Sequence, residues 1–154
     1  MTEQSCELPL SNADEGEIDE ILASARTIAV VGLSDKPDRE SHMVARYLQA
    51  NGYRVIPVNP AVAEVLGERS YPDLVSIPPE IAIDVVDIFR KPEFIQAIVD
   101  AAIARGARVV WMQLGLADNA AAQRARAAGL GVVMDRCMKI EHARWAAHRR
   151  GDRP

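Results

Sequence analysis

Five short apolar segments, each followed by a helix-like segment or a turn into one, constrain the fold of this chain more than any other feature. The first, residues 27–32 (TIAVVG), is a continuous β-branched run, as in parallel strands buried on both faces. Strands are also expected at 53–58, 82–89, 107–113 and 130–135, and helices at 15–25, 40–52, 92–106, 119–129 and 139–148. This alternation predicts an α/β fold: a Rossmann-like, doubly wound, five-stranded parallel sheet in a single domain.

The expected order of the five strands is 3-2-1-4-5, with right-handed crossovers. In such a sheet a ligand binds across the carboxyl ends of the strands, where the strand order reverses. We therefore expect the site between the first and fourth strands, built from the loops that follow the strands.

Composition and charge narrow the class of protein. The chain has 154 residues and a net charge of −4, which argues against a general nucleic-acid binder. It has no apolar run long enough to span a membrane and no basic-then-apolar leader, so we expect a cytoplasmic protein with no membrane partner. The charge is uneven, which predicts an acidic lead-in (1–24) with a short helix, a ligand-binding domain (25–148) and a basic tail (149–154).

The loop after the first strand, GLSDKPDR, carries candidate phosphate-binding residues. Gly32 permits a tight turn and a close approach to a ligand. Ser34 offers a hydroxyl and a free backbone amide, and the next helix begins with unpaired N–H groups that suit phosphate. Lys36 and Arg39 add positive charges that a dinucleotide loop usually lacks. The alternative is that both are ordinary solvated cations with no role in binding.

The end of the second strand argues against NAD. An NAD-binding unit usually ends this strand in Asp or Glu, which bonds the ribose hydroxyl. Here Asn59 and Pro60 stand in its place, and only one glycine of the three-glycine fingerprint is present. The third expected strand ends at Phe89, and Arg90 follows it. The fourth ends at Gln113, and Leu114 and Gly115 follow it.

Together these motifs resemble the small stand-alone CoA-binding-domain proteins of bacteria and archaea. The resemblance rests on VVGLSDKPDRES, VARYLQANGYRVIPVNP, DIFRKPE, VVWMQLG and DRCMKIEH, and covers residues 25–145. This family is similar to the nucleotide-binding domain of the succinyl-CoA synthetase alpha subunit, but the present sequence contains no second domain with a phosphorylated histidine. The resemblance implies coenzyme A or an acyl-CoA as ligand, held by Gly32, Leu33, Ser34, Lys36, Arg39, Asn59, Pro60, Phe89, Arg90, Gln113, Leu114 and Gly115.

The sequence favours a binding or sensing module over an enzyme and predicts no catalytic or metal-binding residue. Two alternatives stay open: an NAD(P)-binding oxidoreductase-like protein, and an acyl- or thiol-transfer enzyme that uses Cys137, with Arg136 and Lys139 as cationic neighbours. Cys6 and Cys137 are expected as reduced thiols, and His42 as a surface residue. A homodimer or another protein partner is compatible with the sequence.

Overall fold

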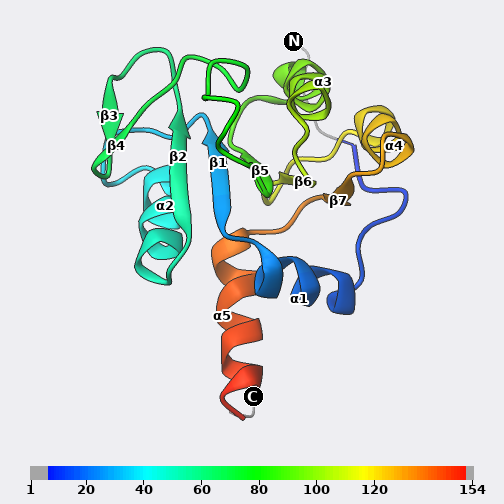
Figure 1. Cartoon of the computed structure of the whole chain (residues 1–154). Helices are drawn as coiled ribbons and strands as arrows, with labels where there is room; N and C mark the ends of the chain where they lie inside the picture. Colours follow the sequence, from blue (N-terminus) through cyan, green and yellow to red (C-terminus); the bar gives the residue numbers. More distant parts are fainter. Residues whose placement is uncertain (1–6, 152–154) are drawn as a thin grey trace.

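A five-stranded parallel sheet in the order β2-β1-β5-β6-β7 forms the centre of the structure (Figure 1). The structure, a computed structural model, describes residues 7–151. The sheet strands are β1 Thr27–Val31, β2 Arg54–Val58, β5 Val85–Ile88, β6 Val109–Met112 and β7 Gly131–Val133, and a small antiparallel hairpin pairs β3 Glu64–Val65 with β4 Glu68–Arg69. The Rossmann-like α/β class predicted from the sequence is confirmed.

Helices cover both faces of the sheet. One face packs against α1 Glu15–Ser24, α2 Glu40–Ala50 and α5 Met138–Arg149, and the other against α3 Ile95–Arg105, which follows the 3-10 turn η1 Pro92–Phe94, and α4 Asn119–Ala127. Within β1 the side chains alternate between two separate cores, with Ile28 and Val30 on the first face and Ala29 and Val31 on the second. The C-terminal half of α5 extends away from the sheet (Figure 1).

The third strand of the sheet lies elsewhere than predicted. The expected order 3-2-1-4-5 placed it at the edge, beyond the second strand, but β5 pairs with β1 and β6 in the middle of the sheet. All four of its residues are completely buried, which suits a central strand. The order of the five sheet strands is therefore 2-1-3-4-5, and the reversal falls between β1 and β5 instead of between the first and fourth strands.

A helix-free connection makes this order possible. Residues 59–84 link β2 to β5 and cross the α3–α4 face, where Leu74 and Ile77 are buried in its core. The Arg105 guanidinium holds this connection by donating to the carbonyls of Pro78 and Ile81 at 2.6 and 2.8 Å. The sequence of this segment has no helical periodicity, so no local pattern predicts the path of the segment across the sheet.

The edge position of β2 explains its proline. Proline removes one N–H donor from a strand and is therefore favoured at an edge or an end. Pro57 lies next to last in β2, which is an edge strand. Its carbonyl accepts from the Tyr71 amide at 3.0 Å on the side away from β1. The missing N–H points to the same side, so no hydrogen bond to β1 is lost.

The buried faces of two helices differ from those that apolar periodicity alone predicts. Periodicity places Ile140 on the inward face of the last helix and Met43 on that of α2, but Ile140 is 58% exposed and Met43 is 38% exposed. Met138 and His142 are the buried residues of α5 instead. Because the buried face of α5 carries the polar His142, the apolar pattern of the sequence did not reveal which face of the helix is buried. Asp118, which stands just before the helix expected at 119–129, caps α4: its side chain accepts from the Ala121 amide at 3.0 Å.

Candidate functional site

Two neighbouring hollows lie at the carboxyl ends of β1 and β5, where the strand order reverses. The first, about 350 Å³, is lined by Gly32, Val58, Asn59, Pro60, Phe89 and Arg90. The second, about 390 Å³, is lined by Glu40, Phe89, Arg90, Lys91, Gln113, Leu114 and Leu116. Because Phe89 and Arg90 line both, we treat the two hollows as one site, called the crevice below. Sequence reasoning missed Val58, Glu40 and Leu116 among its walls.

Gly32 brings the first loop against the loop that follows β5. Its φ of +90° lies in the left-handed region, and its amide donates to the Val58 carbonyl at 2.9 Å. A Cβ at this position would overlap the Phe89 carbonyl oxygen and lie 2.9 Å from Arg90 Cδ. Only glycine therefore satisfies both the backbone conformation and the space.

The loop after Gly32 is organised by hydrogen bonds at the start of α2. The Ser34 amide, expected to be free, donates to Ser41 Oγ at 3.0 Å, and the Lys36 amide donates to Ser34 Oγ at 3.0 Å. His42 was expected at the surface but is buried, with Nδ1 2.9 Å from the Ser34 carbonyl oxygen. These bonds give the loop one shape. The first-turn amides of α2 are available to a ligand, because the N-cap residue Arg39 supplies no side-chain cap.

Asn59 ties the first loop to the second. Its side-chain amide donates to the Leu33 carbonyl at 2.8 Å, and its side-chain oxygen accepts from the Ala61 amide at 2.8 Å. Both ends of the side chain are therefore used within the protein. Leu33 itself is fully buried and lines neither hollow, so its side chain anchors the loop in the core.

Arg90 has a fixed position on the wall between the two hollows. Its guanidinium lies 4.2 Å from the centroid of the Phe94 ring, a cation–π contact. Phe89 is half-buried and packs against the core on the α2 side. Lys91 adds a second cation and Glu40 a carboxylate to the second hollow, so this part of the crevice carries both signs of charge.

The loop after β6 closes the second hollow. Gln113 is buried, and its side-chain oxygen accepts from the Met138 amide at 3.2 Å. Gly115 has a φ of +88°, and its amide donates to Asp135 Oδ1 at 2.7 Å. Leu114, held between these two anchored residues, is 60% exposed. It presents an apolar side chain to the hollow and to solvent.

Lys36 and Arg39 stand apart from the other candidates. Both are exposed, and neither lines the two hollows, although both lie on the loop that leads into α2. Asp35 and Asp38 are exposed on the same loop, so the loop offers local donors and not a net positive field. Their contact with a ligand, like that of Ser34 and Gly115, stays a prediction.

Asp87 is a buried carboxyl beneath the crevice that sequence reasoning left without a role. It is completely buried in β5, opposite Val30 and Trp111, and neither carboxyl oxygen has a hydrogen-bond partner. Burial raises its pKa well above the usual range. Phe89 follows two positions later, so both side chains leave the strand on the same face. Burial therefore favours the neutral form of Asp87, which lies on the same face of the sheet as Phe89.

Cys137 and His142 do not form a nucleophile–base pair. Cys137 is a buried free thiol at the N-cap of α5, and Cys6 lies outside the described residues. His142 Nδ1 lies 2.8 Å from the Tyr47 hydroxyl, and its ring packs edge-to-face against Tyr47, Tyr53 and Trp145. Within residues 7–151, no group of three or more His, Cys, Asp or Glu side chains is arranged to hold a metal ion.

The five-stranded parallel sheet with helices on both faces is a Rossmann-like fold, and the crevice lies at the switch point of the sheet. Residues 26–143 match the model of the CoA binding domain family, and the chain belongs to that family. No helix in the described part of the chain is long and apolar enough to cross a membrane.

Three of the proteins similar to this chain are matched over nearly their whole length. YneT of Bacillus subtilis (strain 168), an uncharacterised protein, is 42% identical over 134 residues, which cover 87% of this chain and 98% of YneT. A hypothetical protein from Pyrococcus horikoshii OT3 has a solved structure with a TM-score of 0.84 and 42% identity, covering 95% of this chain and 99% of that one. A Thermus thermophilus protein has a TM-score of 0.81 and 35% identity, covering 86% and 99%.

Proposed function

We propose that this protein binds coenzyme A or a short acyl-CoA in the crevice, as a binding or sensing module without catalysis of its own. The observation that carries the proposal is the shape of the crevice: two hollows of different character meet at Phe89 and Arg90. Membership of the CoA binding domain family supports the choice of ligand.

The two hollows suit the two halves of coenzyme A. The first is walled by the backbone around Gly32, the amide-bearing side chain of Asn59 and the Arg90 side chain, and the N-terminus of α2 follows the Gly32 loop. Such a setting favours a phosphorylated nucleotide. The second hollow has apolar walls at Phe89, Leu114 and Leu116, which suit the flexible pantetheine arm. We assign the nucleotide to the first hollow and the arm to the second.

The contacts of Asn59 favour coenzyme A over NAD(P). Both ends of its side chain are used in loop contacts, so no carboxylate at the end of β2 meets a ribose hydroxyl as in an NAD site. Acyl or thiol transfer through Cys137 has less support, because the thiol is buried with 5% of its residue surface exposed. A nucleophile needs access to its electrophile.

Thermal unfolding with and without ligand tests the proposal. Coenzyme A at one hundred times its Kd should stabilise the folded protein by about 2.7 kcal/mol, and NADH should not. Lys36→Glu should abolish the shift, as the sequence predicts, and Arg90→Glu should do so through the wall of the crevice. The matched control is Arg124→Glu on α4, because Arg124 lies away from the crevice and pairs with Asp100. No stabilisation of the wild type by millimolar coenzyme A would overturn the proposal.

A further inference from the structure

A third cavity lies at the opposite edge of the sheet from the crevice. It has a volume of about 560 Å³, larger than either hollow of the crevice. Arg26 and Tyr53, which immediately precede β1 and β2, line it from the sheet. His142, Trp145, Arg149 and Arg150 line it from α5, and the end of α1 forms another wall. We call it the α1–α5 cavity.

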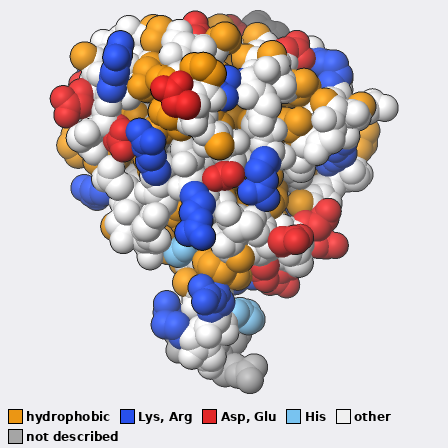
Figure 2. All heavy atoms as spheres, viewed as in Figure 1, with side chains coloured by type: hydrophobic (Ala, Val, Ile, Leu, Met, Phe, Trp, Pro, Cys, Tyr) orange, Lys and Arg blue, Asp and Glu red, His pale blue; other side chains and the backbone are white. Residues whose placement is uncertain are grey.

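The walls of this cavity concentrate positive charge. Three arginines line it, and among the described residues no Asp or Glu does, in a protein whose net charge is −4. Figure 2 shows basic and hydrophobic side chains gathered side by side where α5 leaves the body of the molecule. Helices α1 and α2 end at this cavity with partial negative charges, but the two full guanidinium charges of Arg26 and Arg149 alone exceed these. The cavity therefore attracts anions.

Aromatic rings form the other part of the wall. Tyr53, His142 and Trp145 line the cavity. The His142 ring packs edge-to-face against Tyr53 and Trp145, at centroid distances of 5.5 and 5.4 Å, and against Tyr47 outside the lining at 5.4 Å. Burial lowers the pKa of His142, which favours the neutral form of the ring. The Arg149 guanidinium lies 4.9 Å from the Trp145 ring centroid. A cation and planar rings are thus presented together.

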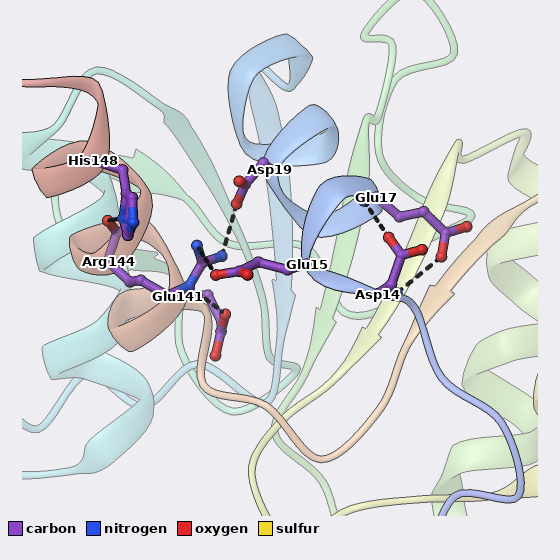
Figure 3. A network of polar contacts seen from close by, with 7 residues as sticks. All are labelled: Asp14, Glu15, Glu17, Asp19, Glu141, Arg144 and His148. Atoms are coloured by element: carbon purple, nitrogen blue, oxygen red, sulfur yellow. Dashed lines mark hydrogen bonds and ion pairs between the residues drawn. The ribbon is translucent and has the colours of Figure 1, made fainter. Parts of the chain in front are cut away.

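The helices that bound the cavity are fixed relative to one another. Arg144 of α5 contacts Glu15 at 2.8 Å and Asp19 at 2.7 Å in α1, and Glu141 in its own helix at 3.3 Å (Figure 3). Burial raises the pKa of Tyr53 to about 12, and its hydroxyl donates to the Leu22 carbonyl at 2.6 Å. The cavity is therefore pre-formed, which lowers the ordering cost of binding.

We propose that the α1–α5 cavity is a second ligand site, which takes a small anion made of a planar ring and a phosphate group. Guanidinium groups bind phosphate through paired N–H donors and also stack on flat rings. The cavity volume falls within the range of small-molecule sites. This inference is independent of the ligand in the crevice, since the two sites share no lining residue.

NMR with 1-naphthyl phosphate as the probe tests the proposal on the wild-type chain. The probe should shift the His142 ring and Trp145 indole signals saturably and raise the His142 pKa, because the bound anion favours imidazolium. The indole N–H of Trp111, fully buried and bonded to the Arg136 carbonyl at 2.9 Å, should not shift. Inorganic phosphate and 1-naphthol, each half of the probe, should bind at least about tenfold more weakly, since each loses about 1.4 kcal/mol or more.

Matched variants assign the binding to the arginines. Arg26→Ala and Arg149→Ala should each weaken probe binding about tenfold, and Arg124→Ala on the other face should leave it unchanged. Arg26 and Arg149 are exposed, so their removal leaves the core intact, as the dispersion of the NMR spectrum will confirm. Absence of shifts at His142 and Trp145 would overturn the proposal. So would equal affinity for 1-naphthol, or unchanged affinity in both arginine variants.

Discussion

The two edges of the sheet present cavities of opposite construction. At the carboxyl edge, the crevice is made by loops whose backbones approach one another, through Gly32 and the hydrogen bonds of Asn59. At the amino edge, the α1–α5 cavity is made by side chains on helices, held together by Arg144 and Tyr53. A site built from backbone tolerates few substitutions at its contact points, whereas a site built from helical side chains can change its ligand without changing the fold.

Substitution of Gly32 should have the largest effect, and it should impair ligand binding in the crevice and not in the α1–α5 cavity. Gly32→Ala meets the Phe89 carbonyl oxygen and forces an alanine into a left-handed conformation, which we expect to cost about 3 kcal/mol of unfolding free energy. Binding of coenzyme A should be lost with it. Urea unfolding and calorimetric titration measure the two effects.

Gly129→Ala is the matched control, because Gly129 has the same kind of φ, +91°, but no atom within 4 Å of an added Cβ. It should cost only the conformational penalty, about 1 kcal/mol, and keep ligand binding. Equal costs for the two variants would show that the close approach at Gly32 is unimportant.

Asn59 should have the next largest effect. Asn59→Ala removes the donor to the Leu33 carbonyl and the acceptor for the Ala61 amide, at a cost of about 2 kcal/mol. Asn59→Asp keeps the acceptor but sets a carboxylate against the Leu33 carbonyl oxygen, so it should cost at least as much and gain no NADH binding. NADH fluorescence measures this binding. Tight NADH binding by Asn59→Asp would contradict the inference that the end of β2 does not suit NAD.

Asp87 should make stability depend on pH. Its folded-state pKa lies above the ordinary 3.8 because the group is buried. The stability it contributes is therefore complete below about pH 3.8 and is lost as pH rises toward the folded-state pKa. Asp87→Asn stays uncharged, so its stability relative to the wild type should increase with pH, by at most about 1.4 kcal/mol per pH unit.

Asp84 provides the opposite case for the same pH series of urea unfolding. Burial alone would raise its pKa, but hydrogen bonds from the Thr27 and Arg26 amides and from Arg108 lower it. Asp84→Asn should therefore lose stability relative to the wild type as pH rises from the lowered folded-state pKa toward 3.8, and the loss should be complete above that value. A pH-independent difference for Asp87→Asn would mean that this carboxyl is not held neutral.

Substitution of Arg144 should have the smallest effect, and it should affect the amino edge of the sheet and not the crevice. Arg144→Ala breaks the contacts of α5 with Glu15 and Asp19, at a cost of about 1 kcal/mol that shrinks as salt is added. Hydrogen exchange should increase in α1 while coenzyme A affinity stays unchanged. A loss of coenzyme A binding in this variant would mean that the two edges are not independent.

The sequence revealed the carboxyl edge better than the amino edge, for a physical reason. Each strand of the parallel sheet ends at the same edge, so residues such as Gly32, Asn59 and Phe89 could be placed together from the strand pattern alone. The hydrogen bonds of this edge could not be predicted in the same way. The bond from the Ser34 amide to Ser41, for example, depends on the path of the loop.

The strand order and the amino edge depended on long-range packing. The helix-free connection of residues 59–84 has no periodicity that would reveal its course over the α3–α4 face. Arg26, Tyr53 and Trp145 lie far apart in sequence and share no motif. The polar His142 on the buried face of α5 obscured the orientation of that helix, and with it the α1–α5 cavity.

Mapping of amide chemical shifts during a coenzyme A titration tests the central claim most directly, because it reports both edges at once. We predict saturable shifts at Gly32–Ser34, Asn59, Phe89–Arg90 and Gln113–Leu114, with the amides of Arg26, Tyr53 and Trp145 unchanged. Shifts confined to those amino-edge residues, or no shifts with millimolar coenzyme A, would contradict the assignment of the crevice as the coenzyme A site.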